Sequence, residues 1–226
     1  MKPESERPGA RSVVLLEFGI GRPVSTALGW LLPNPAIDSL PTMKTVPTRI
    51  DGLVLIEPTV HGDERGFFAE TWRADSWPAA GVTADFVQDN HSRSVRGTLR
   101  GMHFQTSPGQ AKLVRCARGS VLDVAVDLRA GSPTFGEWEG FELSDANMRQ
   151  LFVPIGFAHG FCVLSEEADF TYRCSNYYDA TTEAGIAWDD PDIGIDWPSN
   201  IEVLVSDRDA QAPRLADVAD GLPFRY

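Results

Sequence analysis

Two short segments of the chain carry residues whose types and spacing could support chemistry. Residues 99–105 contain His103, and residues 154–160 contain His159. Each histidine stands near a glycine in a stretch that is typical of a β-strand next to a turn. A histidine side chain can accept a proton near neutral pH. The two segments together predict a small β-barrel with a polar site inside it.

Three further residues would complete an acid–base set around these histidines: Lys112, Tyr172 and Asp209. A carboxylate on one ring nitrogen of a histidine fixes its tautomer and raises its basicity. A lysine ammonium stabilises negative charge that develops on oxygen, and a tyrosine hydroxyl can return a proton. Together these groups suit the removal of a proton next to a carbonyl through an enolate. The residue types alone leave a purely structural role open, because a single strand histidine is more often structural.

A bound metal is the other chemistry that two strand histidines could support. In metal-binding jelly rolls of the cupin type, the first motif supplies two histidines and a carboxylate, and the second supplies another histidine. Here Gln105 stands at the position of the second histidine, and Lys112 follows where a carboxylate would help to hold a cation. A lysine repels a divalent metal, and two histidines alone are a poor ligand set. We therefore expect a site without a metal.

Composition and charge restrict the class of function. The 226 residues are 42% hydrophobic and 23% charged, as in ordinary globular proteins, and the formal net charge is −12. Such an acidic chain is not expected to bind nucleic acid, because phosphate contacts need a cationic surface. No apolar run is long enough to span a bilayer, so no membrane association is expected. The three cysteines form no CxxC pair, which favours free thiols in a reducing, cytoplasmic setting.

The alternation of short apolar runs and turns predicts an all-β fold. From residue 53 onward, Gly and Pro residues separate many of the β-like runs, and helical patterns are brief. We expect strands at residues 53–56, 66–71, 98–104, 112–117, 121–127, 139–143, 150–153, 159–164, 169–173 and 185–188. We expect short helices near residues 74–80, 144–148 and 207–217. Many short strands and few helices favour a sandwich or a jelly-roll barrel.

Residues 1–42 differ from the rest of the chain. Six prolines interrupt them, and no strand or helix pattern continues for long. We expect this segment to be a disordered extension or translated sequence upstream of the true start. A short helix packed on the barrel is the alternative. Residues 43–226 are expected to form one jelly-roll domain.

Ordered motifs from residue 43 onward resemble those of a known family. They include GDERGFF at 62–68, LRGMHFQ at 99–105 and PIGFAHGF at 154–161. The other matching segments are residues 86–92, 112–116, 123–129, 132–136, 170–173 and 176–178. Their order and spacing are similar to those of the dTDP-4-dehydrorhamnose 3,5-epimerase family over nearly all of residues 43–215. No single motif is decisive, but the ordered set is specific.

The resemblance implies a fold, an assembly and a set of site residues. It implies a cupin-type jelly-roll barrel that works as a homodimer with strand exchange and without a metal or a cofactor. By resemblance, His103 is the catalytic base, Asp209 pairs with it, Tyr172 is the general acid and Lys112 lies near the keto oxygen of the substrate. The residues that match positions lining the nucleotide-sugar pocket are Arg65, Glu70, Gln88, Asn90, Arg100, His159, Tyr178 and Glu183. In relatives, the positions of Arg65 and Glu70 reach into the site of the partner subunit.

The expected function of residues 43–226 is therefore that of an epimerase domain. Its substrate would be dTDP-4-dehydro-6-deoxy-D-glucose, inverted at carbons 3 and 5 to give dTDP-4-dehydro-L-rhamnose. Three alternatives stay open from the sequence. They are an epimerase that inverts only one of the two carbons, a non-catalytic module that binds sugar nucleotides, and a metal-dependent cupin enzyme.

Overall fold

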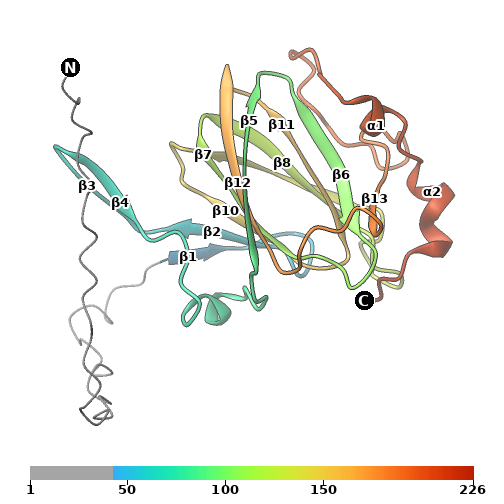
Figure 1. Cartoon of the computed structure of the whole chain (residues 1–226), viewed down its shortest axis with the longest axis horizontal. Coiled ribbons are helices and arrows are strands. Elements are labelled where there is room, and N and C mark those ends of the chain that lie inside the picture. The colour runs from blue at the N-terminus through green and yellow to red at the C-terminus, as the bar shows by residue number, and fades with distance from the viewer. Residues whose placement is uncertain (1–42) are drawn as a thin grey trace, which may run out of the picture. The chain divides into compact units, whose positions relative to one another are not determined.

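Two antiparallel β-sheets form the body of the domain (Figure 1). The computed structural model describes residues 43–226, so the expectation for residues 1–42 lies outside the described residues. The larger sheet has six strands in the order β1-β2-β10-β7-β12-β5. Their bounds are β1 Met43–Val46, β2 Val54–Pro58, β5 Gln88–Val95, β7 Lys112–Arg118, β10 Gln150–Val153 and β12 Glu167–Cys174.

The smaller sheet has five strands in the order β13-β6-β11-β8-β9. Their bounds are β6 Leu99–Gln105, β8 Ser120–Asp127, β9 Trp138–Ser144, β11 Phe157–Val163 and β13 Glu183–Gly185. A separate hairpin of β3 Val60–Asp63 and β4 Gly66–Ala69 projects from the sheets (Figure 1). These two sheets confirm the predicted all-β jelly-roll class.

The helices of the domain are short. They are η1 Trp77–Ala80, α1 Asp207–Ala210, α2 Leu215–Val218 and η2 Ala219–Gly221. No helix in the described part of the chain has the length and hydropathy needed to cross a bilayer. The helix expected near residues 144–148 is wrong, because Ser144 and Asn147 bond each other's backbone amides in a single turn. Met148 then adopts a left-handed φ of 56°, which ends the turn.

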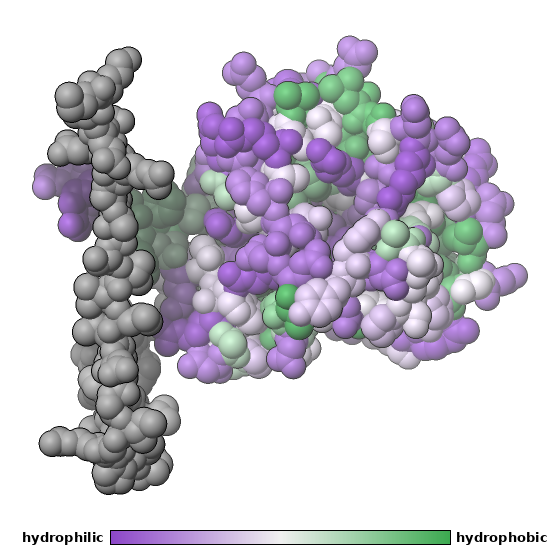
Figure 2. All heavy atoms as spheres, in the orientation of Figure 1, coloured by the Kyte–Doolittle hydropathy of each residue, from purple (hydrophilic) through white to green (hydrophobic). Residues whose placement is uncertain are grey.

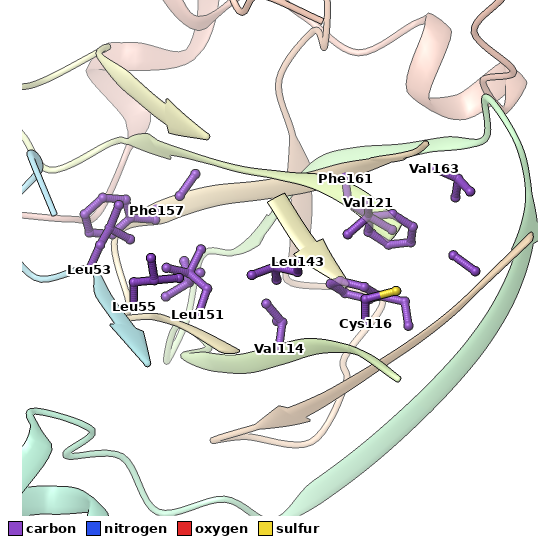
Figure 3. Packing of buried hydrophobic residues seen from close by; sticks show 14 of the residues in the cluster. Leu53, Leu55, Val114, Cys116, Val121, Leu143, Leu151, Phe157, Phe161 and Val163 are labelled. Carbon is purple, nitrogen blue, oxygen red and sulfur yellow. The ribbon is translucent and has the colours of Figure 1, made fainter. Parts of the chain in front are cut away.

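Alternating side chains build the core between the two sheets. Val121 and Ala125 of β8 pack with Val114 of β7 and Phe161 of β11 in one buried cluster, part of which Figure 3 shows. Because every second side chain of a strand points to the same face, Asp123 of β8 faces this interior as well. A charged residue at such a position marks the place where the apolar core gives way to a polar site.

Both outer faces of the sheets are partly covered. Val124 and Val126, on the outer face of β8, pack against Leu215 and Phe224 of the C-terminal segment. On the larger sheet, Trp77 and its neighbours in residues 72–86 cover outward side chains of β7 and β10. The exposed surface seen in Figure 2 is largely hydrophilic, with separate hydrophobic patches.

Candidate active site

Inward-facing positions on both sheets carry the residues that the sequence predicted. His103 on β6 lies directly opposite His159 on β11 in the strand register. Lys112 on β7 and Tyr172 on β12 are each two residues from a core residue of their own strand, so they face the same interior. Four different strands therefore bring these four side chains together.

Two glycines allow β6 and β11 to approach closely beside the histidines. A Cβ on Gly101, whose φ is +148°, would lie 2.6 Å from the Cα of Gly160. A Cβ on Gly160 would lie 2.7 Å from the Sδ of Met102. Any larger residue would force the strands apart, because such contacts are far inside van der Waals distance. The glycine noted next to each histidine thus sets the separation of the two strands.

His103 is held by a buried carboxylate. Its Nε2 lies 2.8 Å from Oδ1 of Asp209, which is 7% exposed. Asp209 belongs to α1, and the side chain of Ser206, the N-cap residue just before this helix, accepts a hydrogen bond from the Asp209 amide at 3.2 Å. Because a carboxylate only accepts hydrogen bonds, Nε2 carries the hydrogen and Nδ1 keeps its lone pair. Burial lowers the pKa of His103 below its ordinary value, and Asp209 only partly offsets this effect.

His159 forms a second pair with a carboxylate deeper in the barrel. Its Nε2 lies 2.9 Å and 3.1 Å from the two carboxylate oxygens of Asp123, which is fully buried. Burial raises the pKa of Asp123, against the opposing influence of His159 and Lys112. In this pair Nε2 of His159 carries the hydrogen, as Nε2 of His103 does in its pair with Asp209.

Lys112 and Tyr172 have pKa values shifted by burial. Desolvation lowers the pKa of Lys112, although Cys174, Asp123 and Glu183 favour its charged form. Desolvation also raises the pKa of Tyr172 above its ordinary value. Tyr172 therefore keeps its proton at neutral pH and can act as an acid.

The predicted site residues gather around two adjoining cavities that share His103, Lys112 and Tyr172. The first cavity, of about 390 Å³, is also lined by Asp209, Arg100 and His159. The second, of about 270 Å³, is also lined by Gln88, Asn90, Tyr178 and Glu183. Ten of the twelve predicted site residues thus line one connected region of the domain. Such a polar cleft has the size of a small-molecule site.

The other two predicted residues lie away from both cavities. Arg65 stands at the turn of the β3–β4 hairpin and forms an ion pair with Asp63. Glu70 follows β4 and accepts hydrogen bonds from Arg73 at 2.7 Å and 2.9 Å. Within one chain, neither residue reaches the site that contains His103.

Several polar residues of this region received no role from the sequence, among them Ser92, Asp123, Cys174 and Arg208. Arg208 donates a hydrogen bond to Glu183 at 2.7 Å, and Tyr178 donates another to the same carboxyl group at 2.8 Å. Asp123 could have been found as a charged residue in the middle of the inward face of β8, between the core residues Val121 and Ala125. There was a weaker indication in the sequence for Arg208, which directly precedes the predicted site residue Asp209.

The donor set of this site does not suit a divalent cation. Within residues 43–226, no three His, Cys, Asp or Glu side chains are grouped as they would be around a metal. Lys112 brings a cation into the cavity, and Gln105 supplies a neutral amide at the second histidine position. Each histidine is already committed to one carboxylate through Nε2. The arrangement instead offers a base, an acid and a cation around a space for a small molecule.

Comparison with known proteins gives the context of this site. A family model described as dTDP-4-dehydrorhamnose 3,5-epimerase matches residues 47–217. The dTDP-4-dehydrorhamnose 3,5-epimerase of Methanothermobacter thermautotrophicus is 51% identical over 166 residues, which cover 73% of this chain and 90% of that protein. The dTDP-4-dehydrorhamnose 3-epimerase of Streptomyces niveus is 44% identical over 180 residues, which cover 79% of this chain and 86% of that protein.

A solved structure agrees with the sequence comparison. It is the dTDP-6-deoxy-D-glucose-3,5-epimerase of Legionella pneumophila Philadelphia 1 in complex with dTDP-4-keto-L-rhamnose. The TM-score is 0.79 at 50% identity, and the match covers 81% of this chain and 98% of that chain. The fold, the ordered motifs and the family model all coincide over the same part of the sequence. This chain belongs to the dTDP-4-dehydrorhamnose 3,5-epimerase family.

Proposed function

We propose that the protein epimerises dTDP-4-dehydro-6-deoxy-D-glucose at carbons 3 and 5, giving dTDP-4-dehydro-L-rhamnose. The observation that carries this proposal is the single cavity lined by His103, Lys112, Tyr172 and Asp209. Those four side chains supply a base, its orienting carboxylate, a cation and an acid. The names of the Methanothermobacter and Legionella relatives support the same reaction.

The mechanism follows from the acidity that a ketone gives to its neighbours. The keto group at carbon 4 acidifies the hydrogens on carbons 3 and 5. His103 takes one of these protons through Nδ1, and the electron pair of the C–H bond moves into an enolate. The Lys112 ammonium stabilises the negative oxygen. Tyr172 then donates a proton to the same carbon from the opposite face, which inverts it.

Repetition of this sequence at the second carbon completes the reaction. Solvent returns a proton to Tyr172 and removes one from His103 between the two steps. A positioned general base is typically worth about 10²- to 10⁴-fold in rate. Asp209 contributes by fixing the imidazole tautomer and stabilising the imidazolium that forms.

Binding of the nucleotide sugar is assigned to the residues that surround the reacting groups. Arg100 and Arg208 offer guanidinium donors for a diphosphate. Ser92 also lines this cavity, and its buried hydroxyl has no hydrogen-bond partner among the described residues. A sugar hydroxyl would satisfy it. Gln88, Asn90 and the other residues of the second cavity would hold the rest of the ligand.

The active form in this proposal is a homodimer that exchanges its β3–β4 hairpin. Phe67 and Phe68 on this hairpin are 65% and 71% exposed. A two-stranded hairpin is marginally stable alone, and an exposed apolar patch favours a partner surface. Arg65 and Glu70 would thereby enter the site of the second copy. Three buried free thiols also support a cytoplasmic location for this domain of residues 43–226.

Reaction in heavy water tests the proposed chemistry. The substrate is generated in place from dTDP-glucose by a dehydratase, and proton NMR follows the sugar after the protein is added. Deuterium should enter at both carbon 3 and carbon 5 of the product. A sample that binds dTDP tightly but exchanges neither position would instead be a sugar-nucleotide binding module.

A one-centre epimerase is the second candidate function. The Streptomyces niveus relative, a 3-epimerase, is only slightly less similar than the 3,5-epimerases. Both activities need the same base and cation. Deuterium at a single carbon in the same experiment would identify the one-centre enzyme.

The metal-dependent alternative has its own test. Lys112 in the cavity and Gln105 at a ligand position weigh against it. Activity is therefore expected to survive exhaustive treatment with a chelator. Loss of activity that a divalent metal restores would support the metal-dependent enzyme.

A further inference from the structure

The outer face of the larger sheet carries a third polar cavity, which shares only Tyr172 with the two described above. Its volume is about 100 Å³, and its lining includes Thr71, Asp89, Arg115, Gln150, Thr171 and Arg173. This volume holds about three water molecules or one small oxyanion. None of the proposed catalytic steps uses these polar side chains.

The strand register places the polar groups of this cavity on one face. Gln150 of β10 lies opposite Arg115 of β7, which in turn lies opposite Thr171 of β12. Arg173 is two residues further along β12 and so points to the same face, opposite Asp89 of β5. Three neighbouring strands therefore bring two guanidinium groups and an amide together.

Two N–H donors on residues that line this cavity are buried without a hydrogen-bond partner. Gln150 is 2% exposed, and its Nε2 has no partner among residues 43–226. Nη1 of Arg173 is also buried and unpaired within the described part of the chain. A buried unpaired donor costs about 1–3 kcal/mol. A ligand that accepts from both donors would remove this cost.

The charge of the cavity indicates an anion. Arg173 donates one hydrogen bond from Nε to Asp89 at 3.3 Å, whereas Arg115 has neither an ion pair nor a hydrogen bond to any described residue. Two guanidinium charges thus face one carboxylate. Burial and the neighbouring Arg173 lower the pKa of Arg115, yet a guanidinium stays charged in proteins. An oxyanion would balance this excess and accept from the unpaired donors.

We propose that this cavity binds a small oxyanion, a carboxylate or a phosphate, through Arg115, Arg173 and Gln150. The ion comes either from solution or from an acidic side chain of a second copy of this chain. Guanidinium groups recognise both by paired, charge-assisted hydrogen bonds. The site is independent of the proposed epimerase activity.

Calorimetric titration with inorganic phosphate, at constant ionic strength, tests the solution source. Saturating dTDP is present to occupy Arg100 and Arg208 in the active site. We expect one phosphate per chain, and Arg115→Gln should weaken its binding about tenfold or more, as for loss of a charge-assisted bond. Arg118→Gln is the matched control, because Arg118 ends the same strand, is exposed and pairs with Glu167. It should leave phosphate binding unchanged.

Sedimentation equilibrium of the same variants tests the second source. If a carboxylate of a second copy fills the cavity, the unmodified protein binds no phosphate there, and Arg115→Gln weakens self-association about tenfold or more. Arg115→Lys is a second variant that keeps the positive charge and shows whether a loss in Arg115→Gln comes from misfolding. Phosphate binding or self-association, whichever depends on Arg115, should fall less in Arg115→Lys than in Arg115→Gln. The proposal is overturned if neither phosphate binding nor self-association depends on Arg115, or if Arg118→Gln has the same effect.

Discussion

At the residue scale, the chemistry depends on how burial and a carboxylate act on one imidazole. Burial lowers the pKa of His103, so the side chain is neutral and able to accept a proton at neutral pH. Asp209 raises this pKa and fixes the hydrogen on Nε2. The two influences together leave Nδ1 as the basic atom.

Replacement of the orienting carboxylate should change both rate and pH dependence. In Asp209→Asn the favourable charge is lost, so the pKa of His103 falls further. The acidic limb of the kcat/KM profile should therefore move to lower pH. The kcat value should fall about 10²- to 10⁴-fold, because the imidazole tautomer is no longer fixed.

The control for this variant lies in the same short helix. Asp207 is exposed, and Asp207→Asn should leave both the rate and the acidic limb unchanged. An acidic limb that stays in place or moves to higher pH in Asp209→Asn would contradict the assigned pairing.

The unpaired hydroxyl of Ser92 gives a second prediction at this scale. Ser92→Ala removes a buried group without a described hydrogen-bond partner, so thermal stability should stay the same or increase. The kcat/KM value should nevertheless fall about tenfold if the hydroxyl bonds the substrate in the transition state. Thermal melts and steady-state kinetics check both parts. Unchanged kinetics would remove Ser92 from the binding site.

At the element scale, sequence patterns predicted the apolar strands and missed the polar ones. The strand expected at residues 150–153 is found with those bounds, and several others differ by one or two residues. Strand β5, Gln88–Val95, was missed because its inward face carries Gln88, Asn90 and Ser92 in place of apolar residues. The alternation of apolar and polar residues that predicts a strand is absent from β5, because the inward side chains of this strand line the site. Strands β1 and β3 were missed as well, and β3 is exposed along its whole length.

The close packing of β6 on β11 makes Gly101 a test of how these elements position the site. The Cβ of Gly101→Ala would collide with the backbone of Gly160. Relief of this collision would require β6 and β11 to move apart, which costs packing energy. We expect a loss of about 1–3 kcal/mol in the free energy of unfolding, measured in urea, together with loss of activity.

A matched glycine in the same domain provides the control. Gly221→Ala places its Cβ in open space and needs no left-handed φ, so it should change neither stability nor activity. Wild-type stability and activity in Gly101→Ala would show that the strand separation does not position the histidines.

At the scale of the whole molecule, one chain holds most of the proposed site, but Arg65 and Glu70 lie outside it. The sequence could predict which residues line the cavity because the ordered motifs place them. It could not predict where the β3–β4 hairpin docks, since that depends on contacts beyond a single chain. Its exposed Phe67 and Phe68 indicate only that the hairpin has an apolar surface that another surface could bury.

Mixing two inactive variants tests the exchange of hairpins. Arg65→Ala and His103→Ala should each be inactive as homodimers, and they should regain activity after unfolding and refolding together. Random pairing in a two-fold dimer gives one intact site in each mixed dimer, so about a quarter of wild-type activity should return. Refolding each variant alone is the control. No recovery in a mixture that does contain mixed dimers would show that Arg65 acts within its own chain.

The most direct test of the account is solvent exchange by His103→Ala on the 4-keto sugar in heavy water. Proton NMR would follow deuterium at carbons 3 and 5, and dTDP binding by the same sample would show that the fold is intact. One imidazole is expected to serve both carbons, so exchange should be lost at both while dTDP still binds. Exchange at near wild-type rates at either carbon would place the base elsewhere and contradict the proposed mechanism.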